Sequence, residues 1–472
     1  MGSREVIDLE GVRVTVAGLG VSGIPAAKVL HARGAHVTVV NDGDDARARE
    51  QAAELEALGV TVRLGDGATL PEGTELVVTA PGWKPDKPLF TAARAAGVEI
   101  WGDVELAWRL RGPDAAPWLA ITGTNGKTTT TQMLASILKA AGLRTAAVGN
   151  IGVSVLDAVL GDEQYDVLAV ELSSYQLHWA PSLRAHSAAV LNLAPDHLDW
   201  HGSMEAYAAD KGRVYEGNRV ACVYNVADKA TEDLVRAADV EEGCRAIGFT
   251  LGTPGPSQLG VVEGILVDRA FVEDRHKNAQ ELAEVSDVNP PAPHNIANAL
   301  AAAALARAFG VPARAVRDGL RNFTPDAHRI AHVADVDSVA YVDDSKATNT
   351  HAAEASLAAY ESIVWIAGGL AKGATFDELV AKSAKRLRGV VLIGQDRALI
   401  REALARHAPE VPVVDLDRTD TGAMLAAVRE AQALAVAGDT VLLAPACASM
   451  DMFANYNKRG EAFAEAVREI GS

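Results

Sequence analysis

Cysteine is scarce in this sequence, and the spacing of the few cysteines excludes two kinds of site. The 472 residues include only Cys222, Cys244 and Cys447. An odd number of cysteines separated by long gaps provides neither a disulfide framework nor a Cys-x-x-Cys metal site. We therefore expect reduced and mostly buried thiols.

Positive charge is also scarce. The chain has 44 lysine and arginine residues against 62 aspartate and glutamate residues, and its formal net charge is -18. Proteins that bind nucleic acid or anionic membranes use clustered lysine and arginine, so we expect neither partner. A phosphorylated ligand would have to be held by a few locally placed cations, glycine loops and metal ions.

Long apolar segments are absent as well. No apolar stretch approaches the roughly 18 uncharged residues that suggest a membrane span, and the alanine-rich run 297–309 is interrupted by Arg307. Charged Arg4, Glu5 and Asp8 occupy the place where a secretion signal would have its apolar segment. We expect a cytoplasmic protein without membrane insertion.

Strand-like runs alternate with helical stretches in three series. The runs lie at 13–17, 36–40, 60–63, 76–79 and 98–101, then at 118–121, 145–148, 167–170, 188–191 and 220–224, and finally at 339–342, 363–367, 390–393, 411–414 and 441–443. This alternation predicts an α/β protein of three domains, each an open, mostly parallel sheet with flanking helices. We place the domains at residues 1–105, 106–324 and 325–472. Between 248 and 293 we expect hairpins and loops that cover one side of the central domain.

A Gly-x-Gly-x-x-Gly motif follows the first strand-like run, at residues 18–23, and Asp42 follows the second run. This pattern is the fingerprint of dinucleotide-binding proteins such as nicotinamide-dependent dehydrogenases. Its physical requirement is only a tight turn and a helix N-terminus that presents N–H groups to a diphosphate. A UDP-sugar would satisfy the motif equally well, and a purely structural turn also stays open.

A second glycine loop lies between the run 118–121 and a helix that we expect to begin near Thr128. It is two residues shorter between its glycines than a Walker A motif. It still suits phosphates, because glycines let the backbone approach them closely, Lys127 neutralises the charge of the terminal phosphates and Thr128 offers a hydroxyl to magnesium. The expected ATP contacts here are Gly123, Thr124, Asn125, Gly126, Lys127, Thr128 and Thr129.

Three further side chains follow strands of the second series. Glu171 ends an apolar strand, where its carboxylate suits a hard cation, and His197 follows the next strand. Lys211 lies a little further on, in the run 210–213. Each residue alone could be structural. Together with the glycine loop, they favour a site for phosphoryl transfer.

These motifs together resemble the Mur ligase family, whose central domain pairs a Gly-Thr-x-Gly-Lys-Thr loop with a strand-end glutamate, a histidine and a lysine. Further matching motifs span residues 294–299, 328–329, 344–349 and 446–453. The last two are similar to those of members that add D-glutamate. The resemblance covers all three expected domains and implies an ATP-dependent amide ligase of peptidoglycan precursor synthesis that works through an acyl phosphate.

The resemblance also implies substrates and the residues that bind them. The first domain would hold the UDP part of UDP-N-acetylmuramoyl-L-alanine and no nicotinamide, through Gly20, Val21, Ser22, Asp42, Pro81 and Gly82, with Asn150 at the muramoyl-alanine end. Additional ATP contacts would come from Asn295, Arg329 and Asp344. D-glutamate would contact Lys346, Thr348, Lys372, Ser449 and Tyr456. Two positions depart from the family pattern, since Tyr456 replaces an expected Phe and Ala80 an expected Ser.

Two magnesium ions fit the need to neutralise the negative charge of the phosphoryl group and the acyl phosphate, and we expect a monomeric enzyme. One ion would lie at Thr128 and Glu171, and the other near His197 and Lys211, with Lys211 carbamylated. Lys127, His197 and Lys211 would be the catalytic residues. The remaining alternatives are a sibling ligase that adds another amino acid or extends folate, a nicotinamide dehydrogenase, and a non-catalytic ATP-gated scaffold.

Overall fold

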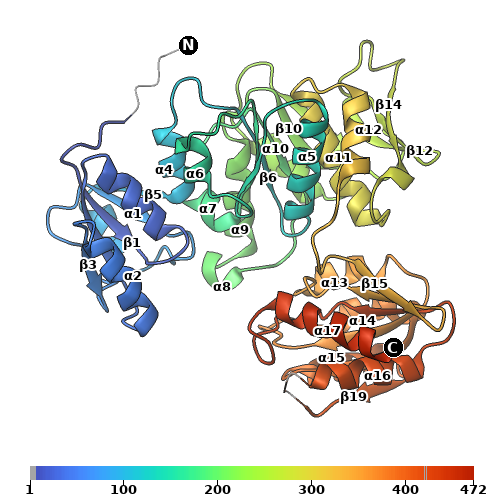
Figure 1. Ribbon diagram of the computed structural model, residues 1–472. Coiled ribbons are helices and arrows are strands. Elements are labelled where there is room, and N and C mark those ends of the chain that lie inside the picture. The colour runs from blue at the N-terminus through green and yellow to red at the C-terminus, as the bar shows by residue number, and fades with distance from the viewer. Residues whose placement is uncertain (1–6, 419, 421, 472) are drawn as a thin grey trace. The chain divides into compact units, whose positions relative to one another are not determined.

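The computed structural model describes residues 7–418, 420 and 422–471. It divides into two compact units, Met1–Val288 with Ala297–Phe323 and Asn289–Ile296 with Thr324–Ser472, and each is described by itself. Two sheets lie in the first unit and one in the second, all mostly parallel with flanking helices (Figure 1), which confirms the predicted fold class. Within the described ranges, no helix is long and apolar enough to cross a membrane.

The first sheet has five parallel strands in the order β3-β2-β1-β4-β5. They are β1 (Arg13–Ala17), β2 (His36–Asn41), β3 (Thr61–Leu64), β4 (Leu76–Thr79) and β5 (Glu99–Gly102), with helices α1 (Gly23–Ala32), α2 (Ala46–Glu56), α3 (Pro88–Ala95) and α4 (Asp103–Leu110). Valines of β1 and β2 are buried against Ala26, Ala27 and Leu30 of α1. The strand order reverses between β1 and β4, and the carboxyl ends of these strands therefore border a crevice in which such sheets bind ligands.

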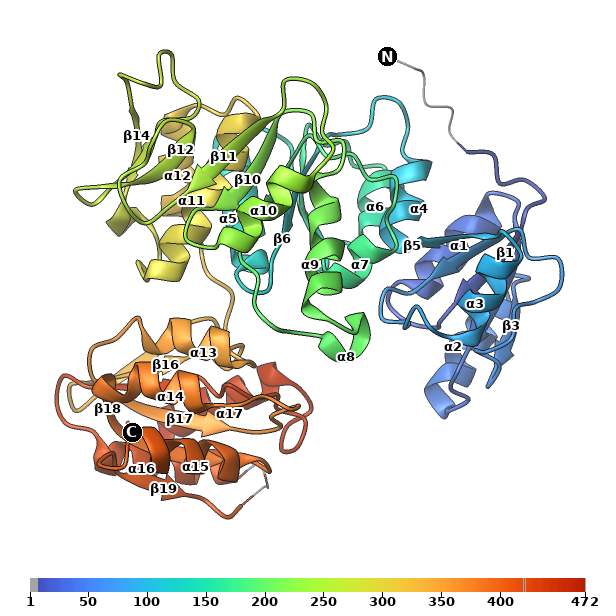
Figure 2. The same ribbon diagram turned by 180° about the vertical axis from the view of Figure 1, so that it is seen from behind.

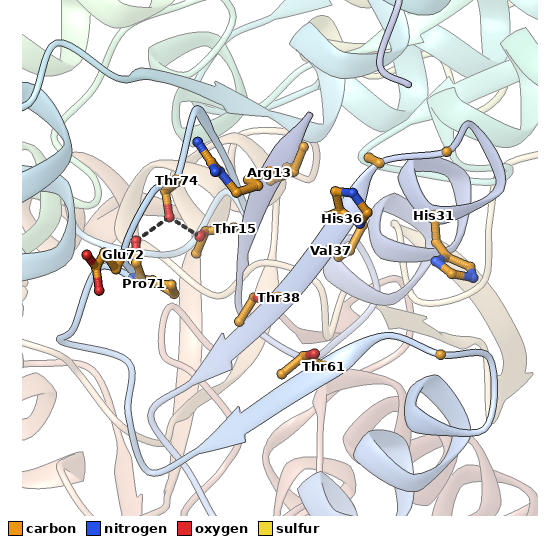
Figure 3. A pocket seen from close by; sticks show the side chains of 14 residues that line it. Arg13, Thr15, His31, His36, Val37, Thr38, Thr61, Pro71, Glu72 and Thr74 are labelled. Atoms are coloured by element: carbon orange, nitrogen blue, oxygen red, sulfur yellow. Dashed lines mark hydrogen bonds between the residues drawn. The ribbon is translucent and has the colours of Figure 1, made fainter. Parts of the chain in front are cut away.

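No helix connects β3 to β4, and a hydroxyl-rich part of this sheet forms a shallow pocket. Thr15, Thr38 and Thr61 are register partners on three adjacent strands. Figure 3 shows them beside Arg13 and His36. The pocket lies toward the amino ends of the strands and contains none of the predicted site residues.

The central sheet has nine strands in the order β14-β13-β12-β11-β10-β9-β6-β8-β7. They are β6 (Trp118–Thr122), β7 (Ala147–Gly149), β8 (Leu168–Glu171), β9 (Ser187–Val190), β10 (Ala221–Asn225), β11 (Arg245–Phe249), β12 (Gln258–Val262), β13 (Ile265–Asp268) and β14 (Gln280–Glu284). The strands β6, β8 and β9 are fully buried, as expected for parallel strands covered on both faces. Their carboxyl ends therefore lie side by side.

Helices cover both faces of the central sheet. They are α5 (Lys127–Ala140), α6 (Val155–Leu160), α7 (Ser174–His178), α8 (Leu198–His201), α9 (Met204–Gly212), α10 (Lys229–Ala237), α11 (Pro293–Ala308) and α12 (Ala313–Asn322). On one face α5 packs against α12, where Gly319 allows close approach (Figure 1). The opposite face carries α10 (Figure 2). The connections run in opposite directions along the sheet, and since crossovers between parallel strands are as a rule right-handed, such connections place their helices on opposite faces.

The expected covering hairpins are instead part of the sheet. Strands β12, β13 and β14 extend its edge in antiparallel pairing and do not lie over one side. The turn between β12 and β13 has positive φ at Glu263 and Gly264, which matches the twist of a tight hairpin. The hairpin strands join the edge of the sheet because their unpaired backbone N–H and C=O groups lie in register with those of the neighbouring strand.

The third sheet has the order β15-β16-β20-β17-β18-β19. Its strands are β15 (Ala331–Val336), β16 (Val339–Asp343), β17 (Ile363–Gly368), β18 (Leu387–Ile393), β19 (Val413–Asp415) and β20 (Thr440–Leu443), with helices α13 (Thr350–Leu357), α14 (Asp377–Ser383), α15 (Arg397–His407), α16 (Ala423–Leu434) and α17 (Tyr456–Ile470). Strand β15 was not predicted. It is a half-exposed edge strand, antiparallel to β16, and lacks the continuous apolar run of the buried strands.

Candidate active site

The loop between β6 and α5 is a tight phosphate-type turn whose glycines are sterically required. Gly126 has φ +83°, and a Cβ there would lie 2.4 Å from Oδ1 of Asn298. A Cβ on Gly123 would lie 3.0 Å from Cβ of Leu191. The backbone therefore follows a path that side chains at these positions would obstruct.

Lys127 is held over this loop. Its Nζ donates to the carbonyl oxygens of Gly123 at 2.9 Å and Thr124 at 2.8 Å. Lys127, Thr128 and Thr129 form the first turn of α5, where free N–H groups and the helix dipole favour an anion. An ammonium, two hydroxyls and a helix N-terminus thus lie together, as a terminal phosphate requires.

The segment after β9 fixes the loop from the side. Asn192 accepts the N–H of Thr124 on its carbonyl oxygen at 3.0 Å and the N–H of Asn125 on its side chain at 2.8 Å. The hydroxyl of Thr124 donates to the carbonyl oxygen of Ala194 at 3.1 Å and lies 3.0 Å from the hydroxyl of Tyr207. These bonds hold the loop rigid before any ligand arrives.

Glu171 ends β8 beside the phosphate loop, in register with Ile121 of β6. It is 1% exposed, and its Oε1 accepts a hydrogen bond from Asn150 Nδ2 at 3.0 Å. Its Oε2 is buried and has no hydrogen-bond partner in the described part of the chain. A buried carboxylate oxygen without a partner is costly, and a bound cation would satisfy it. The donor set fits magnesium, which binds a few carboxylate or hydroxyl oxygens together with substrate phosphates.

His197 lies directly before α8 in the left-handed conformation, with φ +54°. Its ring centroid is 4.8 Å from that of Tyr175. Burial lowers the pKa of His197. The carboxylate of Asp196 opposes this shift, and the positive charges of Lys127 and Lys211 add to it. The neutral imidazole that results is the form that binds metals.

Lys211 is buried beside the phosphate loop, at 1% exposure. Its Nζ donates to the carbonyl oxygen of Gly123 at 2.8 Å and lies 4.7 Å from the ring centroid of Tyr207. No ion pair of Lys211 is present among the described residues. Burial, assisted by Lys127, lowers the pKa of Lys211 well below its ordinary value. A larger fraction of this amine is therefore uncharged than in a surface lysine.

Behind Lys211 lies a buried hydrogen-bonded array that we did not predict. Asp210 Oδ2 is 2.9 Å from Nδ1 of both His178 and His201. His201 Nε2 lies 2.9 Å from the hydroxyl of Ser174. These bonds join α7, α8 and α9, the helix that carries Lys211. The array could not be predicted from the sequence, because its members share no regular spacing.

Replacing Asp210 with asparagine tests this array. The amide keeps the size of the side chain but removes the buried charge that faces two imidazoles, and we expect the free energy of unfolding to fall by about 3 kcal/mol. Urea denaturation would measure the change. Asp233→Asn is a matched control, since Asp233 forms an exposed pair with Lys229 at 2.8 Å, and its effect should stay below about 0.5 kcal/mol. Equal losses in the two variants would contradict a stabilising array.

The first glycine turn combines a sterically required glycine with open space. A Cβ on Gly23 would lie 1.9 Å from the carbonyl oxygen of Gly18, whereas a Cβ on Gly20 would meet no atom within 4 Å. Val21 is 87% exposed. Ser22 donates its hydroxyl to Oδ2 of Asp103 at 3.0 Å. The turn is thus open on the side of Gly20 and Val21.

The loop after β4 links the first sheet to the central one. Trp200 of α8 donates its indole N–H to the carbonyl oxygen of Gly82 at 3.2 Å. Lys84 Nζ donates to the carbonyl oxygen of Asp199 at 2.8 Å. Pro81 and Gly82 therefore lie against the helix that follows His197.

In the second unit, three adjacent strands carry the predicted amino-acid site. Lys346 follows β16, Ser449 follows β20 and Lys372 follows β17, and these strands are neighbours in the sheet. Lys346 Nζ lies 4.1 Å from the ring centroid of Tyr456, at the start of α17. Thr348 donates its backbone N–H to the carbonyl oxygen of Lys346 at 2.8 Å. The strand order thus brings the two predicted cations to one edge.

Arg459 is a buried residue that we did not predict, and it fixes two of these loops. It is 1% exposed and donates to the carbonyl oxygens of Ser345 at 2.8 Å and Cys447 at 3.1 Å. Its bonds connect the loop after β16 to the loop after β20. A lone arginine in a helical stretch carries no sequence signal for such a role.

The three predicted ATP residues of the second unit are largely enclosed. The carboxylate of Asp344 accepts bonds from Ser356 and from the backbone of Ile330, and burial raises its pKa to about 6. Asn295 donates to the carbonyl oxygen of Pro290 at 3.3 Å. Arg329 lies 3.9 Å from a carboxylate oxygen of Asp326, with its side chain 20% exposed.

Three family models match the chain. They are the Mur ligase MurD-like N-terminal domain over residues 12–102, the Mur ligase middle domain over 121–306 and the Mur ligase glutamate ligase domain over 328–447. A UDP-N-acetylmuramoylalanine–D-glutamate ligase of Streptomyces avermitilis is 88% identical over 98% of this chain and 99% of its own. That of Thermobifida fusca is 60% identical over 98% of this chain and 100% of its own.

Solved structures share the fold. A UDP-N-acetylmuramate-alanine ligase from Thermotoga maritima has a TM-score of 0.55 at 19% identity, covering 97% of this chain and 99% of its own. A pseudomurein peptide ligase type C from Methanothermus fervidus has a TM-score of 0.58 at 18% identity, covering 97% and 100%.

Proposed function

Because the chain belongs to the Mur ligase family, we propose that it is an ATP-dependent ligase that joins D-glutamate to UDP-N-acetylmuramoyl-L-alanine in peptidoglycan precursor synthesis. The observation that carries this proposal is the grouping of Lys127, Glu171, His197 and Lys211 around one phosphate loop. An assay of ADP release with a panel of amino acids tests it.

The reaction joins a carboxylate and an amine in two steps. The substrate carboxylate attacks the terminal phosphorus of ATP, which gives an acyl phosphate and ADP; the amine of D-glutamate then displaces phosphate. Catalysis depends on positioning the reacting groups and on neutralising the negative charges of the phosphoryl group and the acyl phosphate. Lys127 and the N–H groups of α5 would hold the terminal phosphate, and the fixed loop would orient it.

Magnesium, when bound, neutralises phosphate charge during transfer. Thr128 and Glu171 would hold one ion, in agreement with the unpaired buried oxygen of Glu171. His197 and Lys211 would hold the second. An ammonium is a poor partner for a cation, so this role requires that Lys211 be modified.

We propose that Lys211 is carbamylated. Its uncharged Nζ attacks carbon dioxide, an N–C bond forms and one proton is released, which leaves an anionic carbamate. Burial favours the uncharged amine that this reaction needs. The modification converts a buried cation into an anion beside the expected metal site.

In our proposal the first sheet holds the UDP group, at the open turn formed by Gly20, Val21 and Ser22 and at Asp42, Pro81 and Gly82. Asn150 would serve the muramoyl-alanine end while it positions Glu171. ATP would also contact Asn295, Arg329 and Asp344. We further propose a cytoplasmic monomer, since a net charge of -18 favours soluble, unassociated chains.

D-glutamate has two carboxylates and needs fixed cations, which Lys346 and Lys372 would provide beside Thr348, Ser449 and Tyr456. We expect Lys346→Ala and Lys372→Ala each to raise the KM for D-glutamate about 10-fold or more, because a charge-assisted hydrogen bond is lost. The KM for ATP should change less than about twofold. Steady-state kinetics would measure both.

Lys458→Ala is the control for these variants, because Lys458 lies in the same unit and forms an exposed pair with Glu461. It should leave both KM values unchanged. A lysine variant that lost ATP affinity but kept its KM for D-glutamate would show that this lysine is misassigned.

A further inference from the structure

We infer that Trp83 recognises the uridine of the substrate, forming a wall of the nucleotide crevice in the first sheet. This inference rests on the proposed function and adds a residue outside the motifs described above. Trp83 follows Gly82 in the loop between β4 and α3. It therefore lies at the β1–β4 crevice, where the strand order reverses.

Two glycines from different loops leave the space that the indole of Trp83 occupies. A Cβ on Gly18, in the first glycine turn, would lie 2.7 Å from Trp83 Nε1. A Cβ on Gly67, in the loop after β3, would lie 2.9 Å from Trp83 Cη2. The indole thus extends from the expected diphosphate turn to the carboxyl end of β3.

Charged groups of both signs lie beside this indole. Lys87 Nζ is 4.6 Å from its ring centroid and 2.5 Å from Oδ2 of Asp42. Asp42 Oδ1 would lie 2.1 Å from a Cβ on Gly67, so the carboxylate borders the same space. Phe90 packs edge-on against Trp83 at 6.1 Å and holds the ring in place.

This combination matches the chemistry of a uridine diphosphate. A planar base gains stacking energy on an aromatic ring, and a carboxylate at the end of the second strand accepts bonds from ribose hydroxyls. An ammonium compensates diphosphate charge. The indole N–H of Trp83, which has no hydrogen-bond partner among the described residues, lies beside the turn and can donate to an oxygen of the ligand.

The test is calorimetric titration of the full-length protein with UDP-N-acetylmuramoyl-L-alanine and with UDP alone. We expect Trp83→Ala to weaken both affinities about 10-fold or more, as loss of one base–aromatic stack does, and Trp83→Phe to weaken them less than about fivefold. Affinity for ATP should stay within about twofold in both variants. Trp101→Phe is the control, because Trp101 lies in the same sheet and donates to Glu99.

The possible outcomes separate this inference from the proposed function. Failure of the unaltered protein to bind either nucleotide would contradict the UDP site itself. If the unaltered protein binds the nucleotides and Trp83→Ala binds them with the same affinity, only the role of Trp83 is overturned. If Trp83→Ala does not fold, fluorescence decides: UDP should change the emission of the unaltered protein, and Trp83→Phe should lose most of that change. A change retained in Trp83→Phe would overturn the inference.

Discussion

Replacing Lys127 with alanine is expected to lower kcat about 1,000-fold, the largest effect of any single change in the phosphate loop. The Lys127 ammonium is fixed by two carbonyl oxygens of its own loop, at the N-terminus of α5. Charge that develops on the transferred phosphoryl group would lose this partner. Rates of ADP release at saturating substrates would measure the loss.

Lys139→Ala provides the comparison for Lys127→Ala. Lys139 lies in the last turn of the same helix and is exposed. Its replacement removes the same charge from α5 but leaves the loop intact, so kcat should be unchanged. Near-normal turnover of Lys127→Ala would contradict the assignment of the ATP site.

Lys211→Ala should be nearly inactive, with kcat lowered about 1,000-fold, because the variant lacks the carbamate anion proposed to face the second metal ion. Small carboxylates such as acetate or propionate should restore activity about 10-fold by occupying the vacated anionic site. Removal of bicarbonate should slow the unaltered enzyme. Lys229→Ala, at an exposed position of α10, retains Lys211, so carboxylates should not raise its activity and removal of bicarbonate should slow it as much as the unaltered enzyme.

Three results together would contradict carbamylation. They are an unextended lysine in a magnesium-bound crystal, no rescue of Lys211→Ala by carboxylates, and no loss of rate on removing bicarbonate. In that case Lys211 would act as the buried hydrogen-bond donor to Gly123 that its geometry also allows.

The buried parallel strands could be predicted because they are continuous apolar runs that end in loop residues. Leu76–Thr79 was located at its observed bounds, and Glu171 was predicted at the end of its strand. The edge strand β15 could not be predicted, because it is half-exposed and has no apolar run. The place of β12, β13 and β14 in the sheet could not be predicted either. The turns of these hairpins can be recognised locally, but the local sequence does not show that the strands join the edge of a sheet.

The site residues also divide into those that could be predicted from the sequence and those that could not. Motif residues such as Lys127 lie next to strand ends, so the sheet order places them together. The array around Asp210 joins residues 9 and 32 positions apart, and only the packing of three helices brings them into contact. Arg459 acts on a loop 114 residues away in the sequence. Such contacts are set by tertiary structure and leave no periodic pattern.

The most direct test of the central claim is ADP release by the purified protein with ATP, magnesium and UDP-N-acetylmuramoyl-L-alanine across a panel of D- and L-amino acids. We predict release that requires D-glutamate, with one UDP-N-acetylmuramoyl-L-alanyl-D-glutamate formed for each ADP. Release that depends on a different amino acid, or none with D-glutamate, would contradict it.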